Sequence, residues 1–362
     1  MQKKYSVRLG ALCEGKYGLR TPETVVREKL GTVLYLFPTW TLEKIREIGE
    51  LCRHENMTFL IDEMFDRLNG DFIPQYKVSK DAILEVLQEY SDVFIGSPLL
   101  CEYGGLLFYW PKTTVAGTAP VHPALMDYQP NDGDSDNLSS EKTENTLLPE
   151  LDSFAEGSRL TVENLRKIIA RADRVGIKRP FLNVEARALT VPFICRAGMD
   201  KIEHEVTYAA DIELNFSAMK GAVLAFGKEG FGIDLAMMWY GGTGHDELWF
   251  QRYRTSFLHA FLRGADPIWA EHGLMKYSAF GKSFDENHEK VRRFRAIQAS
   301  IRAELPKRPA GMPKAVIAVM QGRFDGYVGG WQTHLWGQRD NEAFRLGDAE
   351  RSWELFHRFY QR

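Results

Sequence analysis

The stretch Asp92–Pro111, DVFIGSPLLCEYGGLLFYWP, carries the strand-to-loop transition on which the predicted fold and site depend. Its start, Val93–Ile95, is a short apolar run of the kind that forms a buried strand. The run ends at Gly96–Pro98, and the segment beyond it offers one carboxylate, Glu102, followed by two glycines and an aromatic cluster. An acid after a buried strand, beside flat aromatic side chains, suits a site that cleaves sugars. The alternative is an ordinary strand-to-loop junction with a solvated glutamate.

Apolar runs and helical periodicity alternate along most of the chain. Strands are expected at Tyr5–Leu12, Thr32–Phe37, Met57–Ile61, Val93–Ile95, Phe181–Glu185, Gly230–Gly242 and Ala265–Gly273. Helices are expected at Trp40–His54, Asp81–Tyr90, from Thr161 onward, at Leu248–Gly264 and between Glu286 and Pro306. Strands that are apolar throughout are typical of a parallel sheet covered on both faces, which leaves a closed barrel or an open doubly wound sheet.

Two observations favour the barrel. Neither a GxGxxG motif after the first strand nor a GxxxxGK[ST] motif is present, so the nucleotide-binding form of the open sheet is disfavoured. The run Val206–Phe216 supplies a sixth strand, although Glu213–Phe226 also fits a helix. With that run included the strands number eight, and the expected fold is α/β, a (β/α)8 TIM-type barrel over residues 1–306.

Two segments stand apart from the barrel. Residues 127–157 are polar and acidic, and we expect a mobile surface insertion there. After a Pro-rich linker, a strand at Ala315–Met320 and a helix at Asp348–Tyr360 predict a small partial α/β unit over 314–362. So short a unit has little core of its own, so we expect it to dock on the barrel or on a second copy in a homo-oligomer, or the chain to be a fragment.

Composition excludes several classes of protein. The net charge of -3 and the scattered basic residues argue against nucleic-acid binding, and no apolar run is long enough for a membrane span. The N-terminus lacks the apolar core of a signal peptide. The four cysteines are far apart without CxxC pairing, so buried thiols and a cytoplasmic location are expected.

Acidic residues follow several of the predicted strands, where a barrel places its chemistry. They are Glu14, Asp62, Glu63, Glu102, Glu185 and Glu271. A retaining glycosidase needs two carboxyls about 5–5.5 Å apart, and an inverting one needs about 6.5–9.5 Å. The sequence leaves that distance open.

The late part of the chain resembles a clan A glycoside hydrolase barrel in the segments GKEGFGIDLAMMWYGG (227–242) and LRGADPIWAEHG (262–273). The segment KAVIAVMQGRFDGY (314–327) is similar to the start of the glutamine-amidotransferase-like domain that follows the barrel in family 42 β-galactosidases. In that clan the proton donor ends strand four and the nucleophile ends strand seven. The resemblance implies Glu102 as acid/base and Glu271 as nucleophile, but Cys101 replaces the usual asparagine. Glu271 follows the eighth predicted strand, or the seventh if Val206–Phe216 is a helix.

Further side chains near the strand ends are expected to bind substrate. Aromatic residues at Trp110, Trp239, Tyr240 and Trp269 are candidate sugar platforms, with ordinary rim packing as the alternative. Polar candidates for sugar hydroxyls are Asp62, Glu63, Glu185 and His245, and His272 is placed to orient Glu271. We expect neither a metal nor a cofactor.

Two rival functions use the same layout. Asp62 or Glu63, Glu102 and Glu185 end successive predicted strands, so oxygen ligands could gather Mg²⁺ or Mn²⁺ for a sugar isomerase or enolase-type enzyme, with His272 as base. A barrel that binds carbohydrate without cleaving it is the second. The glycoside hydrolase remains the expected function.

Overall fold

Parallel β-sheets form the centre of the mixed α/β fold in the computed structural model. The structure describes residues 8–13, 21–36, 41–61, 72–73, 78–98, 182–184, 191–207, 212–236, 246–270 and 289–305, parts of 159–180, and residues 318, 320 and 323.

Two four-stranded sheets contain these parallel strands, and in both of them every pairing is parallel. The first has the order β1 (Gly10–Cys13), β2 (Val33–Leu36), β3 (Thr58–Ile61) and β6 (Phe94–Gly96). The second has the order β10 (Ile268–Trp269), β9 (Gly230–Ala236), β8 (Lys201–Thr207) and β7 (Leu182–Val184). A separate antiparallel pair, β4 (Phe72–Ile73) and β5 (Val78–Ser79), lies between β3 and the next helix in sequence.

The two sheets meet at both of their outer edges. Leu9, just before β1, forms a parallel bridge with Ile268 of β10, and the Ile268 amide donates to the Arg8 carbonyl at 2.9 Å. On the other side, the Ser97 amide after β6 donates to the Lys178 carbonyl before β7 at 2.9 Å. The strands therefore follow one another in sequence order, and their carboxyl ends share one side within each sheet.

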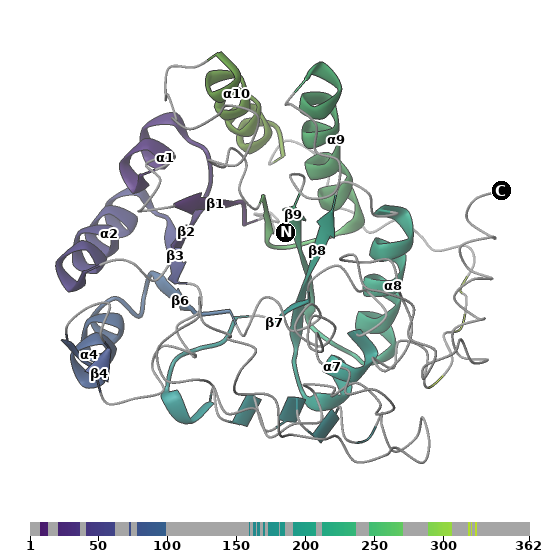
Figure 1. Cartoon of the computed structure of the whole chain (residues 1–362), viewed down its shortest axis with the longest axis horizontal. Helices are drawn as coiled ribbons and strands as arrows, with labels where there is room; N and C mark the ends of the chain where they lie inside the picture. Colours follow the sequence, from purple (N-terminus) through teal and green to yellow (C-terminus); the bar gives the residue numbers. More distant parts are fainter. Residues whose placement is uncertain are drawn as a thin grey trace, which may run out of the picture.

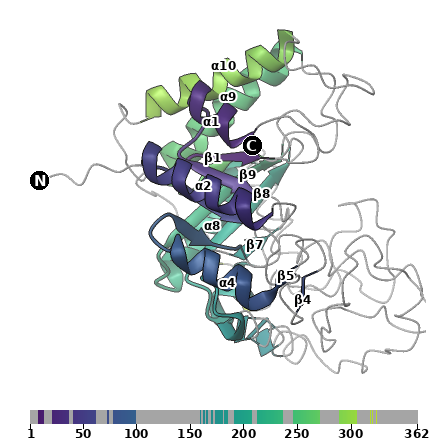
Figure 2. The ribbon, with the colours of Figure 1, turned by 90° about the vertical axis from the view of Figure 1, so that its left-hand side faces the viewer.

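Helices lie outside the strands (Figure 1). They are α1 (Pro22–Glu28), α2 (Leu42–Glu55), α4 (Lys80–Glu89), α7 (Val191–Ala197), α8 (Ile212–Ala225), α9 (Glu247–Arg263) and α10 (Glu289–Glu304). In Figure 1, α1, α2 and α4 flank the first sheet, while α8 and α9 flank the second. Figure 2 shows α10 alongside α9, against which it packs.

Local capping explains where several helices begin and end. The Thr41 hydroxyl accepts the Lys44 amide at 3.2 Å at the start of α2, and the Asp246 carboxylate accepts the Trp249 amide at 2.8 Å at the start of α9. Helix α9 ends at Gly264, whose φ of 88° lies in the left-handed region that glycine adopts without strain. This confirms the prediction that the helix ends there.

The strands of the first sheet are buried on both faces because each face has its own apolar cluster. Alternate residues such as Leu34 and Phe59 belong to the main core, which also contains buried helix residues. The opposite faces contribute a second cluster of Val33, Tyr35, Leu60 and Trp269, with Ile95 packed against it. We call this second cluster the inner cluster. Trp269 comes from β10, so the inner cluster unites both sheets.

The sixth predicted strand was placed wrongly. The structure has a strand at Lys201–Thr207 and a helix at Ile212–Ala225, so most of Val206–Phe216 is not strand, and the alternative helix over Glu213–Phe226 is confirmed in outline. Consequently, β10 is the eighth parallel strand in the described part of the chain, and Glu271 follows the eighth strand rather than the seventh.

The expected buried thiols are confirmed for the two cysteines whose side chains the structure describes. Cys52 and Cys195 are buried and free, and burial raises the pKa of Cys52 to about 12 and that of Cys195 to about 11. Thiols with such pKa values are poor nucleophiles at neutral pH.

Little of the predicted C-terminal unit over 314–362 lies among the described residues. Arg196 of α7 donates to the Arg323 carbonyl at 3.0 Å, which ties that stretch to the helix layer. The predicted strand, helix and amidotransferase-like identity of this unit stay predictions. In the described segments, no helix has both the length and the apolar character needed to cross a bilayer.

Candidate functional site

All of the catalytic and binding residues predicted from the sequence except Trp269 lie outside the described residues. These are Glu102, Glu271, Trp110, Glu185, Trp239, Tyr240, His245, Asp62, Glu63 and His272, and the predicted insertion at 127–157 lies outside as well. What the structure does describe is the set of strands that precede them.

A row of three buried side chains crosses the second sheet near those ends. In the strand register Glu205 of β8 pairs with Asp234 of β9, and Asp234 pairs with Trp269 of β10. Glu205, Asp234 and Trp269 are 4%, 3% and 4% exposed. Register partners on neighbouring parallel strands point to the same face and lie about 4.8 Å apart along the row. Two carboxylates and an indole therefore sit side by side in a nearly dry environment.

Two further buried residues contact the Trp269 indole, and one of them, Tyr35, belongs to the first sheet. Glu203, two residues before Glu205 on β8, is fully buried, and its Oε1 accepts the indole Nε1–H of Trp269 at 2.6 Å. The indole also stacks on Tyr35 of β2, with ring centroids 4.1 Å apart and planes 13° apart. We call Glu203, Glu205, Asp234, Trp269 and Tyr35 the inner polar cluster. Trp269 and Tyr35 also belong to the inner cluster, and the three acids lie on the same strand faces as Trp269, whereas Ile202, Val206 and Ile233 belong to the main core.

This placement changes the interpretation of Trp269. As a candidate sugar platform it would need an open ring face, but one face stacks on Tyr35 and only 4% of the residue is exposed. Trp269 is therefore a packing and anchoring residue beneath the strand ends.

The amino-terminal side of the strands carries a separate set of charges. The Arg8 guanidinium binds both carboxylate oxygens of Asp266, at 3.1 and 3.2 Å, and the Arg8 amide donates to the same carboxylate at 3.0 Å. Lys201 Nζ lies 3.7 Å from Asp266. Burial lowers the pKa of the Lys201 ammonium below its usual 10.5, while Asp266 acts in the opposite direction. These contacts fasten β1, β8 and the start of β10 together.

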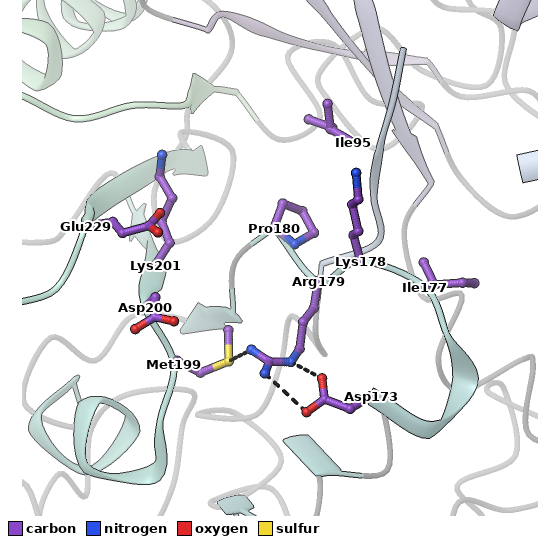
Figure 3. Close-up of a pocket in the computed structure, with 10 residues that line it drawn as sticks. All are labelled: Ile95, Asp173, Ile177, Lys178, Arg179, Pro180, Met199, Asp200, Lys201 and Glu229. Atoms are coloured by element: carbon purple, nitrogen blue, oxygen red, sulfur yellow. Dashed lines mark hydrogen bonds and ion pairs between the residues drawn. The ribbon is translucent and has the colours of Figure 1, made fainter. Parts of the chain in front are cut away.

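A pocket of about 410 Å³ opens near this same end (Figure 3). Its walls come from Ile95, the segment 177–180 before β7, the segment 199–201 and Glu229 before β9. Arg179 is held by Asp173, with Nε 2.7 Å from Oδ1, and lies 3.2 Å from the Met199 sulfur. Most of these residues precede their strands, so the pocket lies on the side opposite to the predicted chemistry.

Two neighbouring features bear on the predicted site. Asp246, which follows the candidate His245 in sequence, caps helix α9 with its carboxylate. Its role in the described structure is therefore to stabilise the start of that helix. Among the described residues, no group of three or more His, Cys, Asp or Glu side chains is arranged to hold a metal ion. The acids proposed for a metal in the rival function lie outside those residues, so that hypothesis stays a prediction.

Sequence reasoning missed Glu203, Glu205 and Asp234. The signal was present in KIEHEVT (201–207), where acids at alternate positions, 203 and 205, are separated by His204 and flanked by the apolar Ile202 and Val206, the period expected of a strand with two different faces. Continuous apolar runs were used to find strands, and this run carries too many charges to satisfy that criterion. Asp234 was included in a predicted strand, but its position inside an apolar run gave no sign of its neighbours.

Comparisons with known proteins give no family. No protein-family model matches the chain, and no curated protein matches it. Among solved structures, an HpcH/HpaI aldolase from Desulfitobacterium hafniense aligns over 74% of this chain and 86% of its own, with 11% identity and a TM-score of 0.32.

Two structures of Gas2 align over more of the chain. Gas2 in complex with compound 10 and Saccharomyces cerevisiae Gas2p in complex with laminaripentaose show 7% and 8% identity. Both have a TM-score of 0.40 and cover 90% of this chain and 73% of theirs. At these values the three likenesses carry no assignment of activity.

Proposed function

We propose that the two sheets close into one (β/α)8 barrel and that the protein is a glycoside hydrolase. Closure is supported by the Leu9–Ile268 bridge on one side and the Ser97–Lys178 hydrogen bond on the other. It is also supported by the inner cluster, which fills the space on the strand faces turned away from the helices. Packed side-chain layers inside and helices outside are the arrangement of such barrels.

The observation that carries the function is the inner polar cluster. Glycoside cleavage passes through a transition state with oxocarbenium character, so positive charge develops on the sugar. We propose that at least one of the buried Glu205 and Asp234 carboxyls is ionised and places negative potential under the strand ends, where low dielectric strengthens it. Such a potential would raise the pKa of a carboxyl placed beside it, which would keep a general acid protonated near neutral pH.

Glu102 and Glu271 are the proposed catalytic pair because they follow β6 and β10 in sequence, on the carboxyl side of those strands. Glu102 protonates the glycosidic oxygen as the leaving group departs. Glu271 attacks the anomeric carbon and forms a covalent glycosyl-enzyme. Glu102 then takes a proton from water, which attacks the same carbon and releases Glu271, so the anomeric configuration is retained.

The other candidates take substrate-binding roles in this proposal. Aromatic faces for the sugar rings come from Trp110, Trp239 and Tyr240, and hydroxyl partners come from Asp62, Glu63, Glu185, His245 and His272. The partner is thus a carbohydrate, bound without a metal or cofactor.

The test is hydrolysis of a panel of aryl α- and β-glycosides by the wild type and by Glu102→Gln and Glu271→Gln. We expect hydrolysis of at least one glycoside, unchanged by chelator, and a loss of at least about 100-fold in kcat in each variant with the fold intact. Azide added to Glu271→Gly should restore turnover and give a glycosyl azide.

Two outcomes would overturn the assignment. Full activity in both variants would remove the catalytic pair. Activity lost to chelator and restored by Mg²⁺ would move the function to the metal-dependent alternative.

A further inference from the structure

We propose that Glu203 is a positioning residue for the hydrolysis proposed above: its carboxylate fixes the Trp269 indole and, through it, the strand end that leads to Glu271. This inference rests on the proposed function for its catalytic part, while the anchor itself rests on the described contacts. It differs from a substrate-binding role because Glu203 is fully buried.

The contact itself is short and directional. Indole Nε1–H is a donor only, and it meets Glu203 Oε1 at 2.6 Å inside the protein. Burial removes competition from water and lowers the local dielectric, and both strengthen this hydrogen bond. The carboxylate therefore sets the direction of the indole in its own plane.

A second contact fixes the remaining freedom of the ring. Tyr35 stacks on the indole at 4.1 Å between centroids, so rotation out of the plane is blocked from the side of the first sheet. Trp269 thus spans β10, β8 and β2 through one side chain. Such a three-way contact defines where the end of β10 lies relative to both sheets.

Glycines on the two flanking strands make room for this anchor. A Cβ at Gly10 of β1 would lie 2.5 Å from the Trp269 Cβ. At Gly232 of β9, a Cβ would lie 2.9 Å from Pro267 Cδ and 3.3 Å from Glu203 Oε1. Strand interiors disfavour glycine, so its presence at both points of closest approach marks a specific packing requirement.

The anchor matters because β10 is short. It contains only Ile268 and Trp269, so backbone pairing alone holds it by few hydrogen bonds. Glu271 is the second residue after Trp269 in the sequence. A displacement of about 1 Å in a reacting group lowers turnover by about 100-fold, so the position of this strand end bears directly on catalysis.

The experiment compares Glu203→Gln, which keeps an acceptor oxygen, with Glu203→Met, which removes it at similar volume. The first readout is the Trp269 indole N–H resonance in ¹H–¹⁵N spectra, assigned by its loss in Trp269→Phe and its persistence in Trp249→Phe. We expect a downfield, slowly exchanging signal in the wild type, a smaller downfield shift in Glu203→Gln, and faster exchange in Glu203→Met.

The second readout is kinetic. We expect kcat to fall about 100-fold in Glu203→Met with KM nearly unchanged, and to recover to within about 10-fold of wild type in Glu203→Gln. Thermal unfolding shows whether the Glu203→Met protein is folded. If it is not, the proposal is tested by the kcat of Glu203→Gln and by the Trp269 indole N–H resonance in that variant.

Three results would overturn the proposal. They are a Trp269 resonance that does not respond to Glu203→Met, wild-type kcat in Glu203→Met despite a released indole, and a Glu203→Gln variant as impaired as Glu203→Met. If the wild type cleaves no glycoside, the proposed function fails and the catalytic part falls with it. The resonance then still decides whether Glu203 anchors Trp269.

Discussion

The two sheets have similar outer faces but opposite inner faces. The helix-facing residues of both are mainly apolar and merge into one core, with the buried His204 of β8 as an exception. On the inner side, the first sheet presents Val33, Leu60 and Ile95, whereas β8 and β9 of the second present Glu203, Glu205 and Asp234. All but the half-buried Ile95 are among the buried residues, so exposure to water does not explain the difference.

The inner face of the first sheet is suited to stability, and we propose that the inner face of the second sheet serves function. An apolar inner face is what packing requires, and the first sheet meets that requirement. Buried carboxylates cost desolvation free energy and are weak evidence of added stability. Their gathering on one sheet, before the strand end that leads to Glu271, supports the proposal that the second sheet influences the electrostatics of the proposed site. The following predictions test this division.

The largest effect is expected from a substitution that places an ionisable side chain on the apolar inner face of the first sheet. Leu60 is 2% exposed within the inner cluster, so Leu60→Glu buries a carboxyl among groups that cannot solvate it. We expect the free energy of unfolding in urea to fall by about 4 kcal/mol or more. Leu60→Met, which conserves volume, is the control and should cost less than about 1.5 kcal/mol. Equal losses in the two variants would contradict the division between the halves.

A medium effect is expected where the halves meet. Gly10→Ala forces a Cβ to within 2.5 Å of the Trp269 Cβ, and such overpacking costs about 1–3 kcal/mol. Gly221→Ala makes the same substitution at an exposed position of α8 with open space around it, and should stabilise by about 0.5–1 kcal/mol. Urea titrations of both variants measure the difference. A Gly10→Ala protein as stable as Gly221→Ala would show that the Trp269 anchor does not constrain β1.

The smallest effect concerns Lys201. Burial lowers the pKa of its ammonium group below the usual 10.5. Between the lowered folded pKa and 10.5 the unfolded state binds more protons than the folded state, so the free energy of unfolding rises with pH in that window. Below the window the penalty of burying the ammonium is fully present. Lys201→Met lacks this titration. The free energy of unfolding of the wild type should therefore rise relative to that of the variant as pH rises, by at most about 1.4 kcal/mol per pH unit. A loss with rising pH would contradict the stated direction.

Much of the fold followed from local sequence signals. The apolar runs Thr32–Phe37 and Met57–Ile61 became β2 and β3, because strands buried on both faces need apolar residues at every position. Helix α9 ended where Gly264 permits a left-handed turn. Strand β8 was missed because its inner face carries two acids, Glu203 and Glu205. The Glu203 side chain is explained by its contact with Trp269 on another strand, which local sequence preference does not indicate.

The candidate site was harder to predict for a related reason. The contact between Glu203 and Trp269 joins residues 66 positions apart, and no local pattern reports it. The room for it depends on Gly10 and Gly232, each on a different strand. Acids after strands can be found from the sequence, whereas the buried side chains that support them become visible only once strand register is known.

The central claim, that Glu271 is the nucleophile of a retaining glycosidase, is tested most directly by trapping the covalent intermediate. The protein would be treated with 2-deoxy-2-fluoro glycosides of the sugar it hydrolyses, digested and examined by peptide mass spectrometry. The account predicts one sugar bound to the peptide that contains Glu271, and none in Glu271→Gln. A label on Asp234, the acid of the seventh strand β9, or an inverted product without any label, would contradict it.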